Sequence, residues 1–105
     1  MENTELAMNL IVHSGNAKSK AMEAIYAAKK SDFETAKEKF KEANESINKA
    51  HNTQTTLITD EANGKHTDIN ILLIHAQDHL MTAIGFIDLG QQLVDFYELT
   101  LVQNK

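Results

Sequence analysis

The chain has 105 residues, a formal net charge of −5 and neither cysteine nor proline. That length fits one small domain, residues 1–105, with a thin core. The lack of cysteine excludes disulfides, a thiolate nucleophile and a zinc–thiolate site, and it favours a cytoplasmic protein. The ten lysines are outnumbered by acids and no arginine is present, which disfavours nucleic acid as a partner because such binding neutralises phosphates with cations.

The first two predicted helices span about residues 4–30 and 32–63, where apolar side chains recur every three or four residues. The break between them carries Ser31 and Glu34 at the spacing of a capping box, which predicts that Ser31 starts the second helix. Gly64 is expected to end that helix in the left-handed conformation.

The second of these helices carries an apolar seam at alternating steps of three and four, which is typical of a helical bundle. Gln54 occupies one place in this seam. The lysines cluster from Lys18 to Lys49 among glutamates, and this pattern indicates a solvated helix surface.

A third helix is predicted over about residues 68–102, with Thr67 or Asp68 as its N-cap. Its apolar residues cover nearly the whole circumference, and a helix of that kind must be buried all round. Two partner helices of the same small chain cover only part of it. The sequence therefore predicts an all-α, antiparallel three-helix bundle whose remaining apolar surface is covered by other copies of the chain.

No membrane insertion is expected. The most apolar stretch, residues 69–89, contains two histidines, a glutamine and an aspartate, which do not suit a membrane span. The first residues lack the basic region and apolar run of a signal peptide. Both observations favour the cytoplasm.

The residues that suggest chemistry lie between Ile74 and Thr82. On a helix, His75 and His79 are one turn apart and share a face. Asp78 lies about 60° from His75 around the helix, given about 100° per residue. On that side the carboxylate projects into an apolar stripe, and the histidines lie at its edge. The stripe consists of Ile71, Ile74, Met81 and Gly85.

Spacing alone leaves three interpretations open. The histidines are polar residues at a bundle edge; or they form a zinc site with Asp78, although the helix shows no third ligand and no glutamate general base; or His75 is a nucleophile. In the last case its neutral imidazole attacks phosphorus, and His79 donates to a phosphate oxygen or fixes the tautomer of His75. The first interpretation leaves Asp78 unexplained, because an ionised carboxylate in an apolar stripe needs a partner or a metal.

The octet from His75 to Thr82, His-Ala-Gln-Asp-His-Leu-Met-Thr, resembles the active-site motif of the enzyme IIA component of lactose, cellobiose and chitobiose phosphotransferase systems. Residues 15–19, 32–36 and 50–58 resemble the same family, so the resemblance covers nearly the whole chain. It implies a homotrimer of nine helices. It also implies that His75 takes a phosphoryl group from the histidine carrier protein HPr and passes it to a cysteine of the cognate IIB component for disaccharide uptake.

His79 is expected to support the phosphoryl group or to orient His75. Gln77, nearly opposite His75 on the helix, is expected to contribute from across a subunit interface. The resemblance further implies that the Asp78 side chains of three subunits meet around one divalent metal, magnesium, at the trimer axis. Three converging carboxylates would repel one another without a cation.

Two other functions are retained as alternatives. A histidine phosphotransfer domain of two-component signalling is also a helical bundle with one reactive histidine, but it typically places a lysine within a turn after the histidine. Here the next lysine is Lys105. The second alternative is a non-catalytic helical adaptor. The sugar is not readable, because IIA components meet proteins and not sugars.

Overall fold

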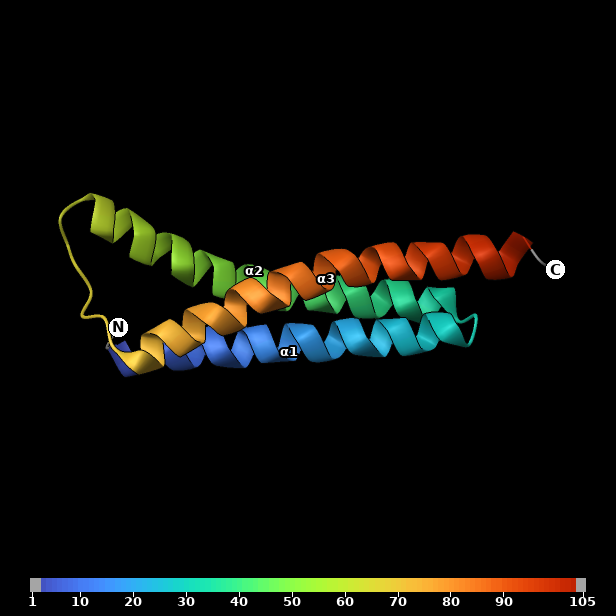
Figure 1. The fold of residues 1–105 in the computed structure, drawn as a ribbon, viewed down its shortest axis with the longest axis horizontal. Coiled ribbons are helices and arrows are strands. Elements are labelled where there is room, and N and C mark those ends of the chain that lie inside the picture. The colour runs from blue at the N-terminus through green and yellow to red at the C-terminus, as the bar shows by residue number, and fades with distance from the viewer. Residues whose placement is uncertain (1–2, 104–105) are drawn as a thin grey trace.

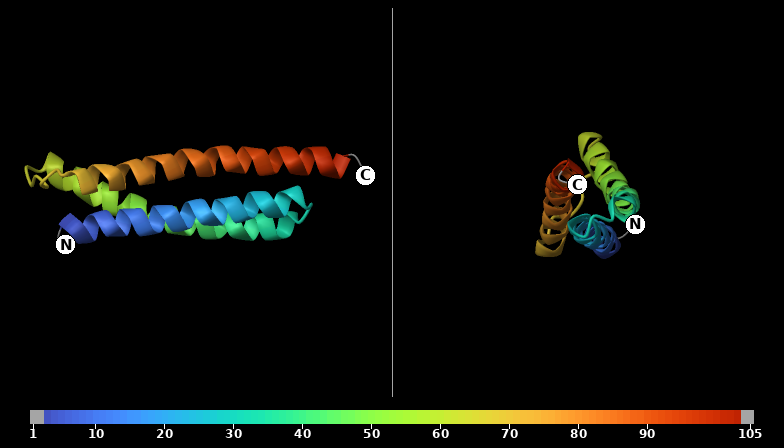
Figure 2. Two further views of the ribbon diagram at one scale, coloured as in Figure 1. Left: turned by 60° about the horizontal axis from the view of Figure 1, so that its bottom comes forward. Right: turned by 90° about the vertical axis from the view of Figure 1, so that its right-hand side faces the viewer.

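Three long helices make up the computed structural model, which describes residues 3–103 (Figure 1). They are α1 (Asn3–Lys29), α2 (Phe33–Ala62) and α3 (Ile71–Gln103). Helix α2 runs antiparallel to the other two, and α3 returns alongside α1 in the same direction (Figures 1 and 2). The predicted all-α three-helix bundle is thereby confirmed, as a rod of 58 × 20 × 19 Å.

The core of this bundle is narrow and rich in alanine. Leu10 and Leu80 are its largest fully buried apolar side chains. Alanines bring the helix axes close together but contribute little buried apolar area each. The close approach is most evident at Gly90, where a Cβ would lie 3.3 Å from both Ile25 Cδ1 and Phe40 Cζ. The buried alanines are Ala7, Ala17, Ala21, Ala24, Ala28, Ala36, Ala43, Ala50, Ala76 and Ala83.

The capping box predicted at Ser31 is wrong. Asp32 is the N-cap of α2, and its Oδ1 accepts the Thr35 backbone N–H at 3.2 Å. Hydrogen bonds from Thr35 lower the pKa of the Asp32 carboxyl. Ser31 instead closes α1 in the left-handed conformation, at φ 63°, and its N–H donates to the Ala28 carbonyl at 3.0 Å. The Asp32 N–H donates to Ala27, which completes a Schellman motif.

This turn supplies a stability prediction. A residue with a Cβ loses roughly 1–2 kcal/mol in the left-handed region, and glycine does not. Ser31→Gly is therefore expected to raise the free energy of unfolding by about 0.5–1 kcal/mol, after the extra unfolded-state entropy of glycine is subtracted. Urea melts followed by circular dichroism at one protein concentration measure the difference. Ser31→Ala is the matched control, and a glycine variant no more stable than that control would contradict the argument.

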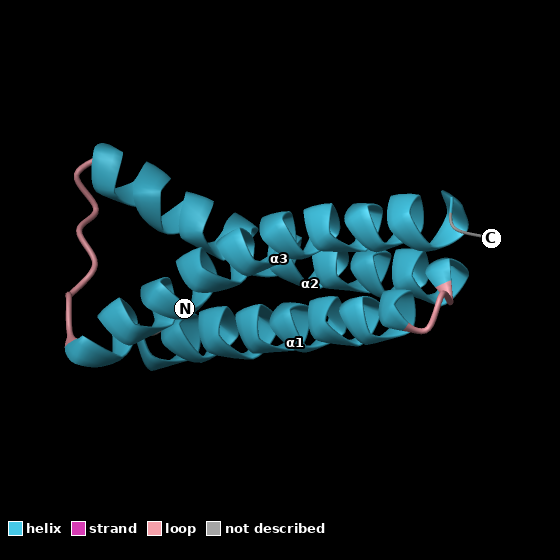
Figure 3. Cartoon of the chain, turned by 45° about the vertical axis from the view of Figure 1, so that its right-hand side comes forward, coloured by secondary structure: helices cyan, strands magenta, loops and turns pink. Residues whose placement is uncertain are grey.

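The start of α3 also differs from the prediction. Neither Thr67 nor Asp68 caps it; Asn70 does, since its Oδ1 accepts the Leu73 N–H at 2.9 Å. The end of α2 agrees with the prediction, because Gly64 has φ 82°. The connection from α2 to α3 is consequently longer than expected, and it spans a gap where the two helices diverge (Figure 3).

Helix α3 buries one face against the rest of the chain and leaves the opposite face bare. The exposed face carries a continuous apolar stripe, with Ile71 84%, Leu89 73% and Phe96 61% exposed. The expectation that two partner helices of one chain cover only part of this helix is therefore confirmed. Even so, no helix in the described part of the chain is long and apolar enough to cross a bilayer. The large apolar members of this stripe, called the α3 stripe below, are Ile71, Ile74, Met81, Leu89, Phe96 and Leu99.

Candidate functional site

His75 and His79 form a bonded pair on the surface of α3. Their Nε2 atoms are 3.1 Å apart, and the rings meet edge to face with centroids 4.5 Å apart. Both residues are exposed. At this separation one nitrogen carries the hydrogen and the other accepts it. When His79 donates, the single lone pair of His75 Nε2 accepts that hydrogen, and it becomes available as a nucleophile once this hydrogen bond opens.

A positive charge from another helix reaches the same side of α3. Lys18 Nζ of α1 lies 5.7 Å from the centroid of the Phe86 ring. Phe86 follows His79 by seven residues, about two turns, and therefore shares its face. Sequence reasoning assigned Lys18 to a solvated cluster and did not place it against Phe86 of α3. No local signal marks it, because the pairing depends on how α1 and α3 are aligned.

Asp78 lies on the α3 stripe, as its position between Ile74 and Met81 requires. The carboxylate is exposed in the single chain, and so are these two neighbours. Among the described residues, no three histidine or acidic side chains lie close enough together to hold a metal ion.

Gln77 faces away from the histidines and toward α2. Its Oε1 accepts a hydrogen bond from Gln54 Nε2 at 2.9 Å, and both side chains are half-buried. Within one chain the structure thus separates Gln77 from His75. Gln54 is a second residue that sequence reasoning did not assign to the site, although its polar side chain in an otherwise apolar seam was the available signal.

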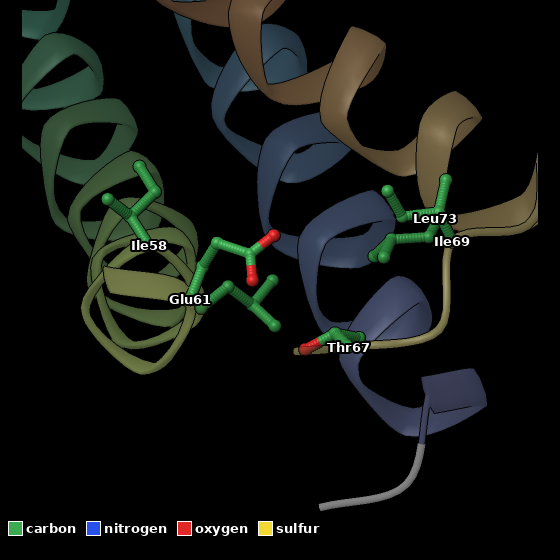
Figure 4. A pocket seen from close by; sticks show the side chains of 6 residues that line it. Ile58, Glu61, Thr67, Ile69 and Leu73 are labelled. Carbon is green, nitrogen blue, oxygen red and sulfur yellow. The ribbon is translucent and has the colours of Figure 1, made fainter. Parts of the chain in front are cut away.

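A hollow of about 200 Å³ opens elsewhere, between the end of α2, the following loop and the start of α3 (Figure 4). Its walls are mostly apolar, and Glu61 is their one charged residue; its carboxylate is paired with His66. The hollow lies on the α2 side of α3, away from the histidine pair. It is lined by Leu57, Ile58, Glu61, Thr67, Ile69 and Leu73.

A helical bundle that presents an exposed imidazole, bonded to a second imidazole, has the features of a histidine phosphoryl carrier. Residues 5–98 match the family described as PTS system, Lactose/Cellobiose specific IIA subunit, and the chain belongs to that family. It is a component of a phosphotransferase system. The resemblance of the chain to this family is thereby confirmed.

Individual relatives are similar over nearly their whole length. The chain is 44% identical over 97 residues to the lichenan-specific phosphotransferase enzyme IIA component of Bacillus subtilis, covering 92% of this chain and 88% of that one. It is 43% identical over 101 residues to the cellobiose-specific EIIA component of Lactococcus lactis, covering 95% and 87%.

Solved structures agree with the fold. The cellobiose-specific enzyme IIA of Bacillus anthracis has a TM-score of 0.91 and 45% identity, covering 97% of this chain and 94% of that chain. The IIA(Chitobiose) protein of Escherichia coli, solved in complex with HPr, has a TM-score of 0.80 and 36% identity, covering 95% and 98%. The similarity therefore includes the region of α3 that carries the histidine pair.

Proposed function

We propose that the protein is a cytoplasmic phosphoryl carrier. His75 accepts a phosphoryl group from phospho-HPr and passes it to a cysteine of a IIB component, which serves disaccharide uptake. The hydrogen bond between the Nε2 atoms of His75 and His79 is the observation that carries this proposal, because it keeps one imidazole unprotonated at an exposed position. The similar IIA(Chitobiose) protein, solved with HPr, supports the donor. HPr is charged from phosphoenolpyruvate, a cytoplasmic metabolite, which supports the location.

The two transfers are displacements at phosphorus. His75 Nε2 forms a bond to phosphorus as the bond to the HPr imidazole breaks, and the electron pair returns to that imidazole. The IIB thiolate then attacks the same phosphorus, and the electron pair of the breaking N–P bond returns to His75. His79 Nε2–H, which first donates to the His75 lone pair, is then free to donate to a phosphoryl oxygen. One hydrogen bond is exchanged for another at each step.

His79→Ala is expected to slow phosphoryl transfer roughly tenfold or more while His75 remains phosphorylatable, because one hydrogen bond to a charged group is lost. His79→Gln is the matched control, since the amide Nε2 of glutamine reaches nearly as far as the imidazole Nε2 and keeps a donor. We expect this variant to recover part of the rate. Rapid-quench measurement of transfer in both directions provides the test, and equal rates for His79→Ala and wild type would remove this role.

The proposal includes a homotrimer built on the α3 stripe. The stripe is exposed along the length of α3 and lies opposite the face packed on α1 and α2. Three copies packed through it would bury these side chains and bring three Asp78 carboxylates together. A set of carboxylate oxygens suits magnesium, whose charge would offset their mutual repulsion. We assign Asp78 from three subunits as the metal ligands.

In such a trimer Gln77 joins the site of another subunit. His75 lies about 60° to one side of Asp78 and Gln77 about 100° to the other, at about 100° per residue. When parallel helices pack around an axis, positions on one flank of the seam face the opposite flank of the next helix, as e and g positions do in coiled coils. His75 of one subunit and Gln77 of the next thus become neighbours.

Mass spectrometry separates the candidate functions. Incubation with phosphoenolpyruvate, enzyme I and HPr is expected to add one phosphoryl group per chain. A two-component phosphotransfer domain would remain unmodified under these conditions and would take phosphate from a response regulator instead; an adaptor would take none from either.

The sugar requires a different assay, because relatives named for lichenan, lactose and cellobiose are 44%, 42% and 43% identical to this chain. Identifying the IIB protein that accepts the phosphate decides it.

A further inference from the structure

Helices α2 and α3 are linked by a polar contact at the height of the histidine pair. Gln54 Nε2 donates to Gln77 Oε1 at 2.9 Å and lies 3.8 Å from Met81 Sδ. Both glutamine side chains are half-buried. The transfers proposed above give Gln77 a role but leave Gln54 without one.

The thioether of Met81 fixes which way the Gln54 amide faces. Sulfur in a thioether only accepts hydrogen bonds, so the group beside it must be the Gln54 NH₂ and not its oxygen. One N–H then points to Met81 Sδ and the other to Gln77 Oε1. Because the Gln77 oxygen is occupied, the Gln77 NH₂ group is turned away from α2 with donors to spare.

We propose that Gln54 is a positioning residue, which holds the Gln77 amide so that its NH₂ donates to the phosphoryl group on His75 of the neighbouring subunit. This inference rests on the proposed function and on its trimer. Without Gln54, the amide of Gln77 has two orientations of similar energy, and in one of them its oxygen faces the phosphoryl oxygens. Gln54 removes that second orientation.

The chemistry suits a carrier. The chain has no arginine, so no bidentate cation holds the phosphoryl group in place. A neutral amide donor stabilises the phosphoryl oxygens more weakly than a guanidinium does, and it leaves the group free to move on to IIB. A Gln77 amide with a fixed orientation provides the same weak donor in each subunit.

Two substitutions at Gln54 test the proposal. The carboxylate of Q54E only accepts hydrogen bonds, so it turns the Gln77 NH₂ inward and its oxygen toward the phosphoryl group. We expect Q54E to slow transfer from phospho-HPr roughly tenfold, as Q77A does, because each removes one hydrogen bond to a charged group. Q54M keeps the bulk of the side chain and leaves the Gln77 amide free to turn. We expect a two- to threefold loss of transfer rate, because the amide then offers its NH₂ group in only one of two orientations.

The experiment compares each Gln54 variant in the wild-type and Q77A backgrounds. If Gln54 acts through Gln77, Q54E has no further effect on Q77A. The lifetime of phospho-His75 should fall in parallel, while the sedimentation coefficient and the melting temperature stay at wild-type values. Thr53→Val is the matched control: it breaks the 2.7 Å hydrogen bond from Thr53 to Asn9, a polar contact between α1 and α2, and should leave transfer unchanged.

Three results would overturn the inference. The first is a loss in Q54E that is as large in the Q77A background as in wild type, since Gln54 would then act by charge or structure alone. The second is wild-type transfer in Q77A. The third is full transfer in Q54E. Failure of the proposed function is distinguishable from these, because wild-type protein would then take no phosphate from phospho-HPr before any variant is compared, and the inference would fall with it.

Discussion

His75→Ala is expected to abolish phosphoryl uptake from phospho-HPr and to leave the bundle folded. His75 is exposed, so its removal opens no cavity, and an exposed substitution of this kind changes the free energy of unfolding by about 0.5 kcal/mol or less. The loss of activity should be complete, because the proposed function places the phosphoryl group on His75 alone and gives His79 only the role of a hydrogen-bond donor. Mass spectrometry and circular dichroism of the same sample measure both effects.

The remaining histidines provide the controls for this variant. His13, His51 and His66 lie outside the octet, and His66 is paired with Glu61. His51→Ala changes an exposed imidazole on α2 and is expected to retain one phosphoryl group per chain. Stoichiometric phosphohistidine in His75→Ala would show that the nucleophile has been assigned to the wrong residue.

Helical periodicity predicted the existence and order of the three helices, because the apolar spacing of a packed helix is repeated many times along the chain. It did not predict their ends, which depend on single residues. Ser31 and Asp32 are both good N-cap types. Asp32 serves because Ser31 is already committed to the left-handed turn that closes α1. Likewise three N-cap types follow Gly64, and the distance between the diverging ends of α2 and α3 favours the last of them, Asn70.

The sequence predicted the parts of the site that lie close together in the chain, and it did not predict the contacts between helices. His75, Gln77, Asp78 and His79 lie within five residues, so their relative directions follow from the helix itself. The contacts of Lys18 with Phe86 and of Gln54 with Gln77 join residues far apart in the sequence. They depend on how the helices slide and turn against one another, and side-chain packing that no periodicity records decides this.

The second large expected effect is a change in the assembly of chains through the α3 stripe. Full burial of a large apolar side chain contributes about 1.5–3 kcal/mol, so six per chain contribute about 10 kcal/mol or more. Association costs an estimated 4–15 kcal/mol or more in lost freedom. A trimer has two such association costs, about 8–30 kcal/mol together, and burial of the stripe by three chains, about 30 kcal/mol, offsets them. The three Asp78 carboxylates oppose it, because each loses several kcal/mol on leaving water unless a cation lies between them.

Replacing Asp78 should consequently make the trimer stable without a metal ion. Asp78→Leu puts an apolar group of similar bulk on the stripe and removes the repulsion, so its trimer is expected to be as tight as the wild-type trimer or tighter, with or without chelator. Chelation should weaken the wild-type trimer by at least roughly tenfold without melting its helices, since one uncompensated buried charge already costs more than about 1.4 kcal/mol. Asp95→Asn, which neutralises an exposed acid of α3 off the stripe, should keep the chelator sensitivity of wild type.

Sedimentation of wild type, Asp78→Leu and Asp95→Asn, each with magnesium and with chelator, separates the two parts of this prediction. We expect the apolar stripe to drive assembly in all three proteins and the carboxylate to set a metal requirement only where Asp78 is present. A wild-type monomer at micromolar concentration in magnesium would overturn the trimer. A wild-type trimer that is indifferent to chelator would leave the nine-helix assembly in place and remove the metal from its axis.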